Sequence, residues 1–544
     1  MKYKFLAYIP AVAAALLSLS SCSEGFLDNE MDGGYITPDQ LTKASKWNPK
    51  VLLGQTQGVT TSLIRYQAGG STHQSDFGQK SVDIATDIIT HDMVFSRGST
   101  YGYYRLEAQG TATDKANSTT TWYTYYKVID ACNFTFGTLG SDEVEPEDAD
   151  NKLYYAEAKA ARAFAYYNLL TLFTGDYAEY KDKKVLPVYR GQSGTYHAPQ
   201  VTSDVYQQVF TDCDQAIAAF ENAKAAGLTP SIDQPSEAVA YTIKAYAYLQ
   251  MGEYAKAKEA ADKAIETSGK QILPKADLYY GFNTVNNDNW MWGVDITADN
   301  TGALCTFWGM MDLYTYSYVY AGDWKVINSD LFQQVPEWDG RRDWFTTSPY
   351  YVYYYNRFGA TALLPTGKFH SDRSTSVGGD RNWESDIHFM RVEECYLIAA
   401  EAEARLGNLS SASTYLKAIL ENRVNPQLAP SDSPANATEE EMKAWQEDED
   451  RKEALRNKAE NDINALASMN QEQLLDEIFF NWRVEMWGEG KTLRTIKRFH
   501  KDIACPANDG YTEQGVISGT SPKLVFQIPN QELQYNPAMK DADQ

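Results

Sequence analysis

Apolar residues recur at helical spacing in several long stretches of the chain. The clearest stretches are 52–64, 122–136 and 153–173, and spacing of three and four residues is typical of one buried helix face. The third stretch is rich in small side chains, which let neighbouring helices approach closely: Ala156, Ala158, Ala160, Ala161, Ala163 and Ala165. The pattern predicts a mainly α-helical protein whose helices pack against one another.

Two segments have related patterns and predict helix pairs. Residues 245–265 read AYAYLQMGEYAKAKEAADKAI, and residues 401–419 read EAEARLGNLSSASTYLKAI. In each segment a glycine, Gly252 or Gly407, separates two periodic halves, and small residues follow it. This pattern resembles the tetratricopeptide repeat, in which Gly and Ala lie where two antiparallel helices touch. Because such repeats need neighbours to bury their apolar faces, we expect tetratricopeptide-like helix pairs to form a scaffold.

Two other stretches, about 65–121 and 270–385, have little helical period and many Gly, Ser, Asn, Asp and aromatic residues. We interpret them as loop-rich excursions from the helical scaffold, and we expect the irregular part to carry the ligand site because binding residues concentrate on loops. Residues 426–470 are acidic and contain prolines near their start. They predict a loop followed by an exposed, solvated helix.

The N-terminal region has the features of a targeting segment. Lys2 and Lys4 precede an apolar run, 5–19, that is too short to span a membrane comfortably. The run ends in Leu19-Ser20-Ser21-Cys22, which resembles the bacterial lipobox, and a simple secretory signal is the alternative. We predict a signal peptide at 1–21, lipidation of Cys22, a tether over 22–50 and a single domain over 51–544.

Composition narrows the possible functions. Lys and Arg number 49 and Asp and Glu number 73, which gives a net charge of −24. This charge argues against a nucleic-acid partner, because a polyanion would meet a surface of its own sign. The hydrophobic fraction of 43% argues against wholesale disorder. The aromatic residues include 38 tyrosines, and rings with one polar edge suit interfaces and sugar sites.

The sequence offers little catalytic chemistry. The histidines are not at metal-binding helical spacing, and neither H-E-x-x-H nor G-x-S-x-G occurs. Residues 488–492 end like a phosphate-binding loop, but Glu485 stands where the first glycine is required. We therefore predict that the protein is not an enzyme, although a pair of carboxylates for a surface glycoside hydrolase can be neither identified nor excluded among so many acids.

No cofactor is predicted. Calcium is conceivable near Asn286, Asn287 and Asp288, but these residues fit no calcium-loop pattern and an Asn-rich turn explains them better. The cysteines after Cys22 are scattered, which is typical of small buried side chains with at most one or two disulfides. They are Cys132, Cys213, Cys305, Cys395 and Cys505.

Aromatic clusters give the candidate ligand site. Tyrosines at 101, 103 and 104 follow Arg97, and a second cluster runs from 307 to 324. Tyrosines at 314, 316, 318 and 320 alternate with other residues, so in a strand they would share one face. A ring face can take the C–H face of a pyranose, and a peptide would fit the same shallow geometry. We predict ligand contacts at Arg97, Tyr101, Tyr104, Trp308, Tyr316, Tyr318 and Trp324, and interpret the clusters at 122–126 and 350–358 as structural packing.

Several short motifs, in one order along the chain, carry a family resemblance. They are Phe26-Leu27-Asp28 after the lipobox, AEAKAARAFAYYNLLTLFTGDY at 156–177, RVEECYLIAAEA at 391–402, Arg483, Glu485, Glu489 and Gly490 as R-x-E…E-G, and Ile528-Pro529, Glu532 and Asn536-Pro537 near the end. Together they resemble the SusD/RagB family of outer-membrane lipoproteins from Bacteroidetes. Glu485 and Glu489, four residues apart, are interpreted as ion-pair partners in the scaffold.

The resemblance implies a cell-surface lipoprotein of a Gram-negative outer membrane. Such a protein captures oligo- or polysaccharide and delivers it to a SusC-like TonB-dependent transporter. Peptide capture, as in RagB-like relatives, and a structural subunit that binds only its transporter are the alternatives. The shared motifs are scaffold residues, so they do not identify the ligand.

Overall fold

The computed structural model describes most of the chain after the N-terminal region. The described residues are 38–95, 111–112, 114, 116–191, 194–346, 363–371, 381, 383–505 and 515–543. The signal segment, Cys22, the cluster at 350–358 and three of the site residues, Arg97, Tyr101 and Tyr104, lie outside them.

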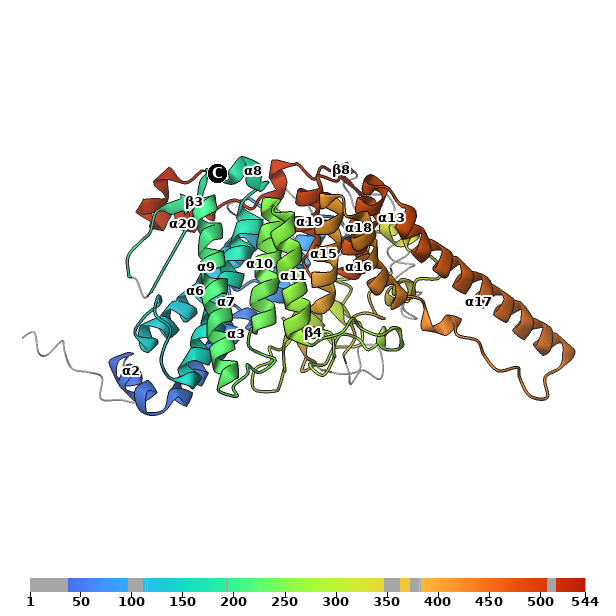
Figure 1. Cartoon of the computed structure of the whole chain (residues 1–544), viewed down its shortest axis with the longest axis horizontal. Coiled ribbons are helices and arrows are strands. Elements are labelled where there is room, and N and C mark those ends of the chain that lie inside the picture. Colours follow the sequence, from blue (N-terminus) through green and yellow to red (C-terminus); the bar gives the residue numbers. More distant parts are fainter. Residues whose placement is uncertain are drawn as a thin grey trace, which may run out of the picture.

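The regular structure is mainly helical, as the pattern predicts (Figure 1). The helices before the first helix pair are α2 (Pro38–Trp47), α3 (Leu53–Ile64), α4 (Gln79–Ile89), α6 (Ala116–Leu139), α7 (Ala149–Phe173), α8 (Tyr177–Tyr180) and α9 (Thr202–Ala225). Those that follow are α10 (Glu237–Met251), α11 (Tyr254–Ser268), α12 (Phe307–Met311), α13 (Ser329–Gln334), α15 (Val392–Leu406), α16 (Leu409–Glu421), α17 (Glu439–Ala465), α18 (Gln471–Glu485), α19 (Thr492–Phe499) and α20 (Asn530–Tyr535).

Successive helices stand side by side. In Figure 1, α9, α10, α11 and α15 form a row, and each packs on the next. Helix α7 packs on both α6 and α9, and its predicted alanine-rich stretch is buried, including Ala156, Ala160 and Ala163. The small side chains therefore lie where the neighbouring helices approach it, as the sequence predicts.

Both predicted helix pairs are present. Helices α10 and α11 meet at Gly252, and α15 and α16 meet at Gly407. These two glycines end their helices in the left-handed region, with φ of +78° and +85°, which costs a glycine little because it has no Cβ. The small residues Ala257 and Ala412 are buried in the second helix of each pair.

Strands are short and form four two-stranded antiparallel sheets in the described part of the chain. Two sheets join segments that are close in sequence: β2 (Lys184–Pro187) with β3 (Pro199–Val201), and β7 (Ile503–Cys505) with β8 (Gly515–Ile517). The other two join distant segments: β1 (Met93–Phe95) with β5 (Lys325–Ile327), and β4 (Trp290–Val294) with β6 (Ile387–Arg391). These last two sheets tie the irregular region to the helical scaffold.

The prediction that 65–121 is a loop is wrong in part. Helix α4 and strand β1 lie within it, and α6 begins at Ala116. Every residue of α4 is buried, polar ones included, although its sequence has a polar side and an apolar side at helical spacing. Its polar groups find distant partners instead; Asp87, for example, accepts from the backbone N–H of Gly488 at 2.7 Å. Residues 270–385 likewise contain short helices and strands.

A buried ion network joins the C-terminal helices to the irregular region. Glu485 accepts from Arg391 at 2.7 Å and from Arg423 at 2.8 Å, and Glu489 accepts from Arg391 at 2.9 Å and Lys368 at 2.7 Å. Burial opposes ionisation of Glu485, but the guanidinium groups of Arg423 and Arg391 outweigh it and hold its pKa well below the ordinary value. The interpretation of both glutamates as scaffold ion-pair partners is confirmed.

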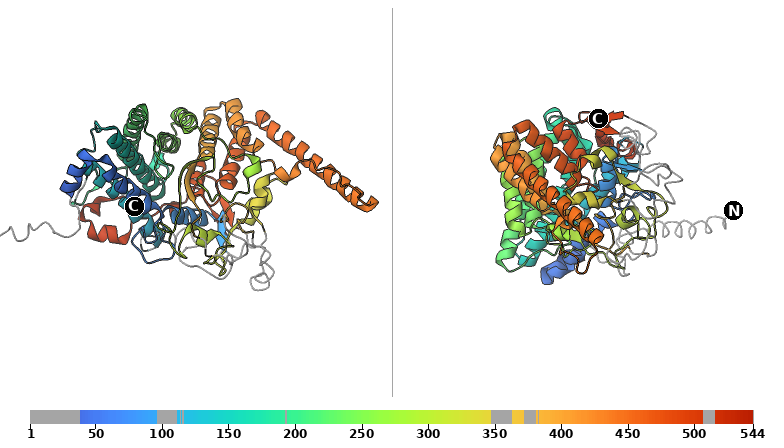
Figure 2. Two further views of the ribbon diagram at one scale, coloured as in Figure 1. Left: turned by 90° about the horizontal axis from the view of Figure 1, so that it is seen from below. Right: turned by 90° about the vertical axis from the view of Figure 1, so that its right-hand side faces the viewer.

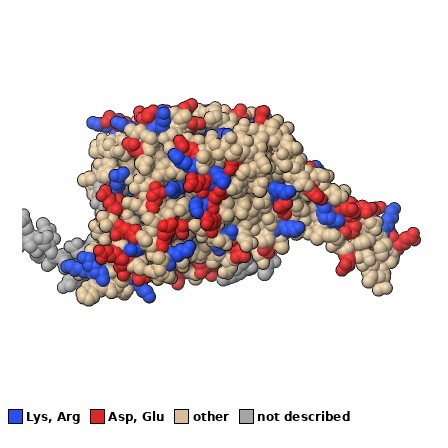
Figure 3. All heavy atoms as spheres, viewed as in Figure 1, with Lys and Arg blue, Asp and Glu red and all other residues tan. Residues whose placement is uncertain are grey.

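Helix α17 projects away from the rest of the molecule, as the two orientations of Figures 1 and 2 show. Thr438 and Glu441 form a capping box at its start, and only Ala459 and Ile463 near its end are buried. The prediction of a loop followed by an exposed helix at 426–470 is confirmed. Figure 3 shows acidic side chains across the helical face and at the outer end of α17.

None of the helices in the described ranges combines the length and apolar composition that a membrane span requires. Four of the cysteines that follow Cys22 are free thiols: Cys132, Cys213, Cys305 and Cys395. Three of them are buried, and Cys305 is half-buried, so for these three the prediction of small buried side chains is confirmed.

Candidate functional site

Four tyrosines on the segment between α12 and β5 form the candidate site. We call Tyr314, Tyr316, Tyr318 and Tyr320 the tyrosine face. Each is more exposed than the residues between them, and Tyr316 reaches 44% exposure. The segment consists of bends and turns with a single bridge residue, Thr315, and is not a strand, yet the alternation that the sequence indicates is retained.

Inward-pointing polar residues turn the tyrosines outward. Asp312 is buried and accepts from the backbone N–H of Tyr314 at 3.0 Å and from the Thr315 hydroxyl at 2.7 Å. The Ser317 hydroxyl donates to the Leu304 carbonyl at 2.8 Å. Because the hydrogen bonds of these short side chains are made inside the turn, they stay buried, and the tyrosines that alternate with them face outward.

Residues from other segments complete the surroundings of the tyrosine face. The Arg381 guanidinium lies 5.2 Å from the centre of the Tyr316 ring, and Tyr316 and Tyr320 are 5.7 Å apart at 43°. The Tyr318 hydroxyl is 3.6 Å from the Cys305 Sγ. Tyr66 of the first loop-rich excursion lies beside Gly302 of the second, and burial, followed by the neighbouring Cys305, raises the pKa of Tyr66.

Trp308 is a correction to the sequence-based site. Its side chain is 1% exposed, and its indole N–H donates to the Ser385 carbonyl at 2.6 Å. Phe307 packs edge-on against it at 5.3 Å. The ring therefore has no free face for a ligand, and it fixes α12 against the chain that enters β6.

The prediction that Trp324 contacts the ligand is also wrong, because this side chain is buried too. It is 2% exposed and belongs to a small hydrophobic cluster under the tyrosine face. Its partners come from three separate segments, so no local pattern indicates this burial: Val94, Leu313, Val319, Val326 and Leu364. Trp324 supports the turn that presents the tyrosines and does not itself offer a ring face.

The structure thus separates the predicted ligand contacts into different groups. Tyr316 and Tyr318 lie together on the tyrosine face, and Arg97, Tyr101 and Tyr104 lie outside the described residues. Tyr314 and Tyr320 belong to the same alternation but were not among the predicted contacts. Arg381 was missed because only the tertiary fold brings it over Tyr316.

The tyrosine face has the chemistry of a reversible sugar site. Its rings offer flat apolar area with a polar hydroxyl edge, and the Arg381 guanidinium supplies hydrogen-bond donors in a planar fork. Such a surface can hold a pyranose by stacking and by hydrogen bonds to its hydroxyls. It needs no cofactor for that.

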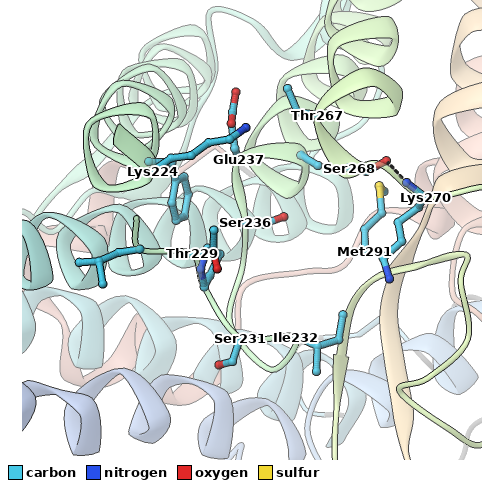
Figure 4. A pocket seen from close by; sticks show the side chains of 14 residues that line it. Lys224, Thr229, Ser231, Ile232, Ser236, Glu237, Thr267, Ser268, Lys270 and Met291 are labelled. Carbon is cyan, nitrogen blue, oxygen red and sulfur yellow. Dashed lines mark hydrogen bonds between the residues drawn. The ribbon is translucent and has the colours of Figure 1, made fainter. Parts of the chain in front are cut away.

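A cavity of about 300 Å³ at the ends of α9, α10 and α11 is a second possible site. Figure 4 shows Lys224, Glu237 and Lys270 around it, with Met291 on one wall. Most of its hydroxyls serve the helix ends: Ser236 caps α10, and Ser268 donates to the Ile265 carbonyl at 2.9 Å. It presents no exposed ring, because Phe220 is buried, so it fits a stacked sugar less well.

The segment considered for calcium forms a hydrogen-bonded turn. The backbone N–H and the side-chain amide of Asn286 both donate to the Thr284 hydroxyl, at 3.2 and 3.3 Å. The backbone N–H of Asn287 donates to the Thr284 carbonyl at 3.3 Å. The interpretation as an Asn-rich turn is confirmed.

Comparison with known proteins gives two family matches that together span most of the chain. The model of the SusD family matches residues 268–543. A model described as starch-binding, associating with the outer membrane, matches residues 64–249. No curated protein matches the chain.

Solved structures share the fold at low sequence identity. A SusD-like carbohydrate-binding protein from Bacteroides vulgatus is 21% identical with a TM-score of 0.65, covering 90% of this chain and 97% of its own. A SusD superfamily protein from Bacteroides thetaiotaomicron is 19% identical with a TM-score of 0.66, covering 90% and 99%. One from Bacteroides fragilis is 17% identical with a TM-score of 0.66, covering 91% and 99%.

Proposed function

This chain belongs to the SusD family, and from that premise we propose that it binds carbohydrate through the tyrosine face without cleaving it. The observation that carries the proposal is the outward row of rings at Tyr314, Tyr316, Tyr318 and Tyr320, with Arg381 over Tyr316. Stacked rings with adjacent donors suit a neutral or acidic glycan that must be released again. The two family descriptions support the same class of ligand.

The proposed setting is the outer face of the outer membrane. Cys22 would carry the lipid, and each acyl methylene that enters the bilayer contributes about 0.8 kcal/mol to anchoring. From there the protein would deliver glycan to a SusC-like TonB-dependent transporter. The description of the second family match, which refers to association with the outer membrane, supports this location.

Affinity electrophoresis tests the binding proposal. Native gels that contain amylopectin, xylan, galactomannan or polygalacturonate should slow the protein in at least one case. Tyr316→Ala should weaken that retention about tenfold, because loss of one stacked ring removes on the order of 1.4 kcal/mol of contact. Incubation of the protein with the polysaccharide that slows it should release no new reducing ends.

Trp47→Ala is the matched control. Trp47 is an exposed aromatic residue on α2, with 92% of its side chain accessible, and its replacement should leave retention unchanged. Equal retention of Tyr316→Ala and the native protein would exclude the tyrosine face as the binding surface. Retention by a peptide panel and by none of the polysaccharides would contradict the ligand class.

A further inference from the structure

Another pocket lies where α6, the chain after β2, and α20 meet. It is separate from the tyrosine face and from the cavity at the ends of α9, α10 and α11. It encloses about 190 Å³. Its walls are contributed by Trp122, Tyr123, Tyr126, Ile129, Asp130 and Asn133 of α6, by Tyr189 and Gly191, and by Glu532 of α20. Residues about four hundred positions apart in the sequence thus converge on one small cavity.

The helical period of α6 explains why one helix supplies so much of the wall. Trp122, Tyr126, Ile129 and Asn133 follow one another at spacings of four, three and four residues, so they share one helix face. The aromatic cluster at 122–126 was interpreted from the sequence as structural packing. For Trp122, which is 1% exposed, this interpretation is confirmed. Tyr123 and Tyr126 are only half-buried and line the pocket.

Hydrogen bonds fix these walls in place. The Tyr126 hydroxyl donates to the Pro187 carbonyl at 3.0 Å. The Asn133 amide donates to the Tyr189 carbonyl at 3.1 Å and accepts from Arg162 at 2.7 Å. The pocket is therefore formed before any ligand arrives, and a ligand would not have to order these side chains.

The rings that line the pocket also contact one another. Trp122 and Tyr126 are 4.8 Å apart at 44°, and Tyr126 meets Tyr189 edge-on at 5.9 Å and 88°. The other face of Tyr189 stacks on His197 at 4.5 Å. Ring faces carry partial negative charge, so several of them around one cavity favour a cation.

The formal charges of the wall have the same sign. Asp130 and Glu532 line the pocket, and no lysine or arginine is among its lining residues in the part of the chain that the structure describes. Asn536 donates to one Glu532 oxygen at 2.7 Å and orients that carboxylate. Tyr123 and Glu532 line the same pocket, and burial, followed by the Glu532 charge, raises the pKa of Tyr123.

We propose that this pocket binds a small organic cation, an ammonium group on a compact apolar body, between the rings of α6 and the carboxylates of Asp130 and Glu532. Its volume lies below the roughly 300–1,000 Å³ of sites for drug-sized ligands, so it accepts one such group. Cation–π attraction and two carboxylates give the selectivity for charge. The site is independent of glycan binding at the tyrosine face.

Calorimetric titration of the full chain with choline tests the proposal. The control ligand is 3,3-dimethylbutan-1-ol, which has the same shape without the charge. Choline should bind at least tenfold more tightly than the neutral alcohol. A parallel comparison of glucosamine with glucose shows whether the cation can also arrive on a sugar ring.

Variants at the carboxylates locate the binding. Glu532→Gln and Asp130→Asn should each weaken choline binding about fivefold or more, and Tyr123→Leu, which keeps apolar area but removes the ring, should do the same. Glu447→Gln, an exposed carboxylate on α17, and Tyr316→Ala should have no effect. Equal binding of the two shape-matched ligands, no choline binding, or full choline affinity in the carboxylate variants would overturn the proposal.

Discussion

Single residues show where sequence reasoning succeeds and where it ends. The outward direction of Tyr316 and Tyr318 follows from alternation with small or short polar residues, which is a local pattern. The burial of Trp308 depends on the carbonyl of Ser385, far along the chain. An indole in a glycine- and tyrosine-rich segment has the same local sequence whether it points outward or inward, so only the fold distinguishes the two.

Glu157 on α7 gives a prediction at the same scale. It is buried, and burial first and the charge of Asp233 second raise its pKa to about 8. A raised folded-state pKa means that the folded protein holds this proton where the unfolded chain has lost it. The contribution of this proton to the free energy of unfolding is therefore complete below about pH 4.5 and is lost as the pH rises towards 8.

Glu157→Gln should remove this pH dependence, because an amide does not ionise. We expect the variant to match the native protein near pH 4.5 and to exceed its free energy of unfolding by about 4 kcal/mol at pH 8. Urea denaturation at the two pH values measures the difference. Glu447→Gln should show no such difference, and a Glu157→Gln variant with a constant offset at both pH values would contradict the raised pKa.

At the scale of elements, long stretches with sustained helical periodicity were predictable, and a short helix inside a loop-like stretch was not. The bounds of α3 and α7 agree closely with the periodic stretches 52–64 and 153–173. Helix α4 was missed because it is short and lies within the Gly-, Ser-, Thr- and Tyr-rich stretch 65–121; its buried polar residues are paired inside the protein, as Asp87 is with Gly488. The helix pairs were predictable because Gly252 and Gly407 interrupt the period where a left-handed residue is needed.

The same reasoning predicts opposite effects for two Gly→Ala substitutions. Gly407→Ala should lower the free energy of unfolding by about 1 kcal/mol, because a Cβ is strained at φ of +85° although it would meet nothing within 4 Å. Gly58→Ala, inside α3 and with equal space, should raise it by about 1 kcal/mol. Urea denaturation compares the two. Similar shifts of one sign would mean that space, and not backbone conformation, decides the effect.

At the scale of the whole molecule, helices provide a scaffold and distant segments assemble the binding surfaces. Buried ion pairs of Glu485 with Arg341 and of Glu489 with Lys368 hold the irregular region onto the C-terminal helices. The family and the scaffold motifs could be predicted from the sequence, because those motifs encode such pairs. The pocket of α6 and α20 could not, because its charge and shape exist only when the end of the chain folds back beside α6.

Amide hydrogen exchange of the full chain, with and without a saturating amount of the polysaccharide that retains it in native gels, tests the central claim most directly. We predict slower exchange in peptides that cover 304–322 and 381–386 when polysaccharide is bound, and little change along α17. Unchanged exchange in the peptides of the tyrosine face, with protection only elsewhere, would contradict the account.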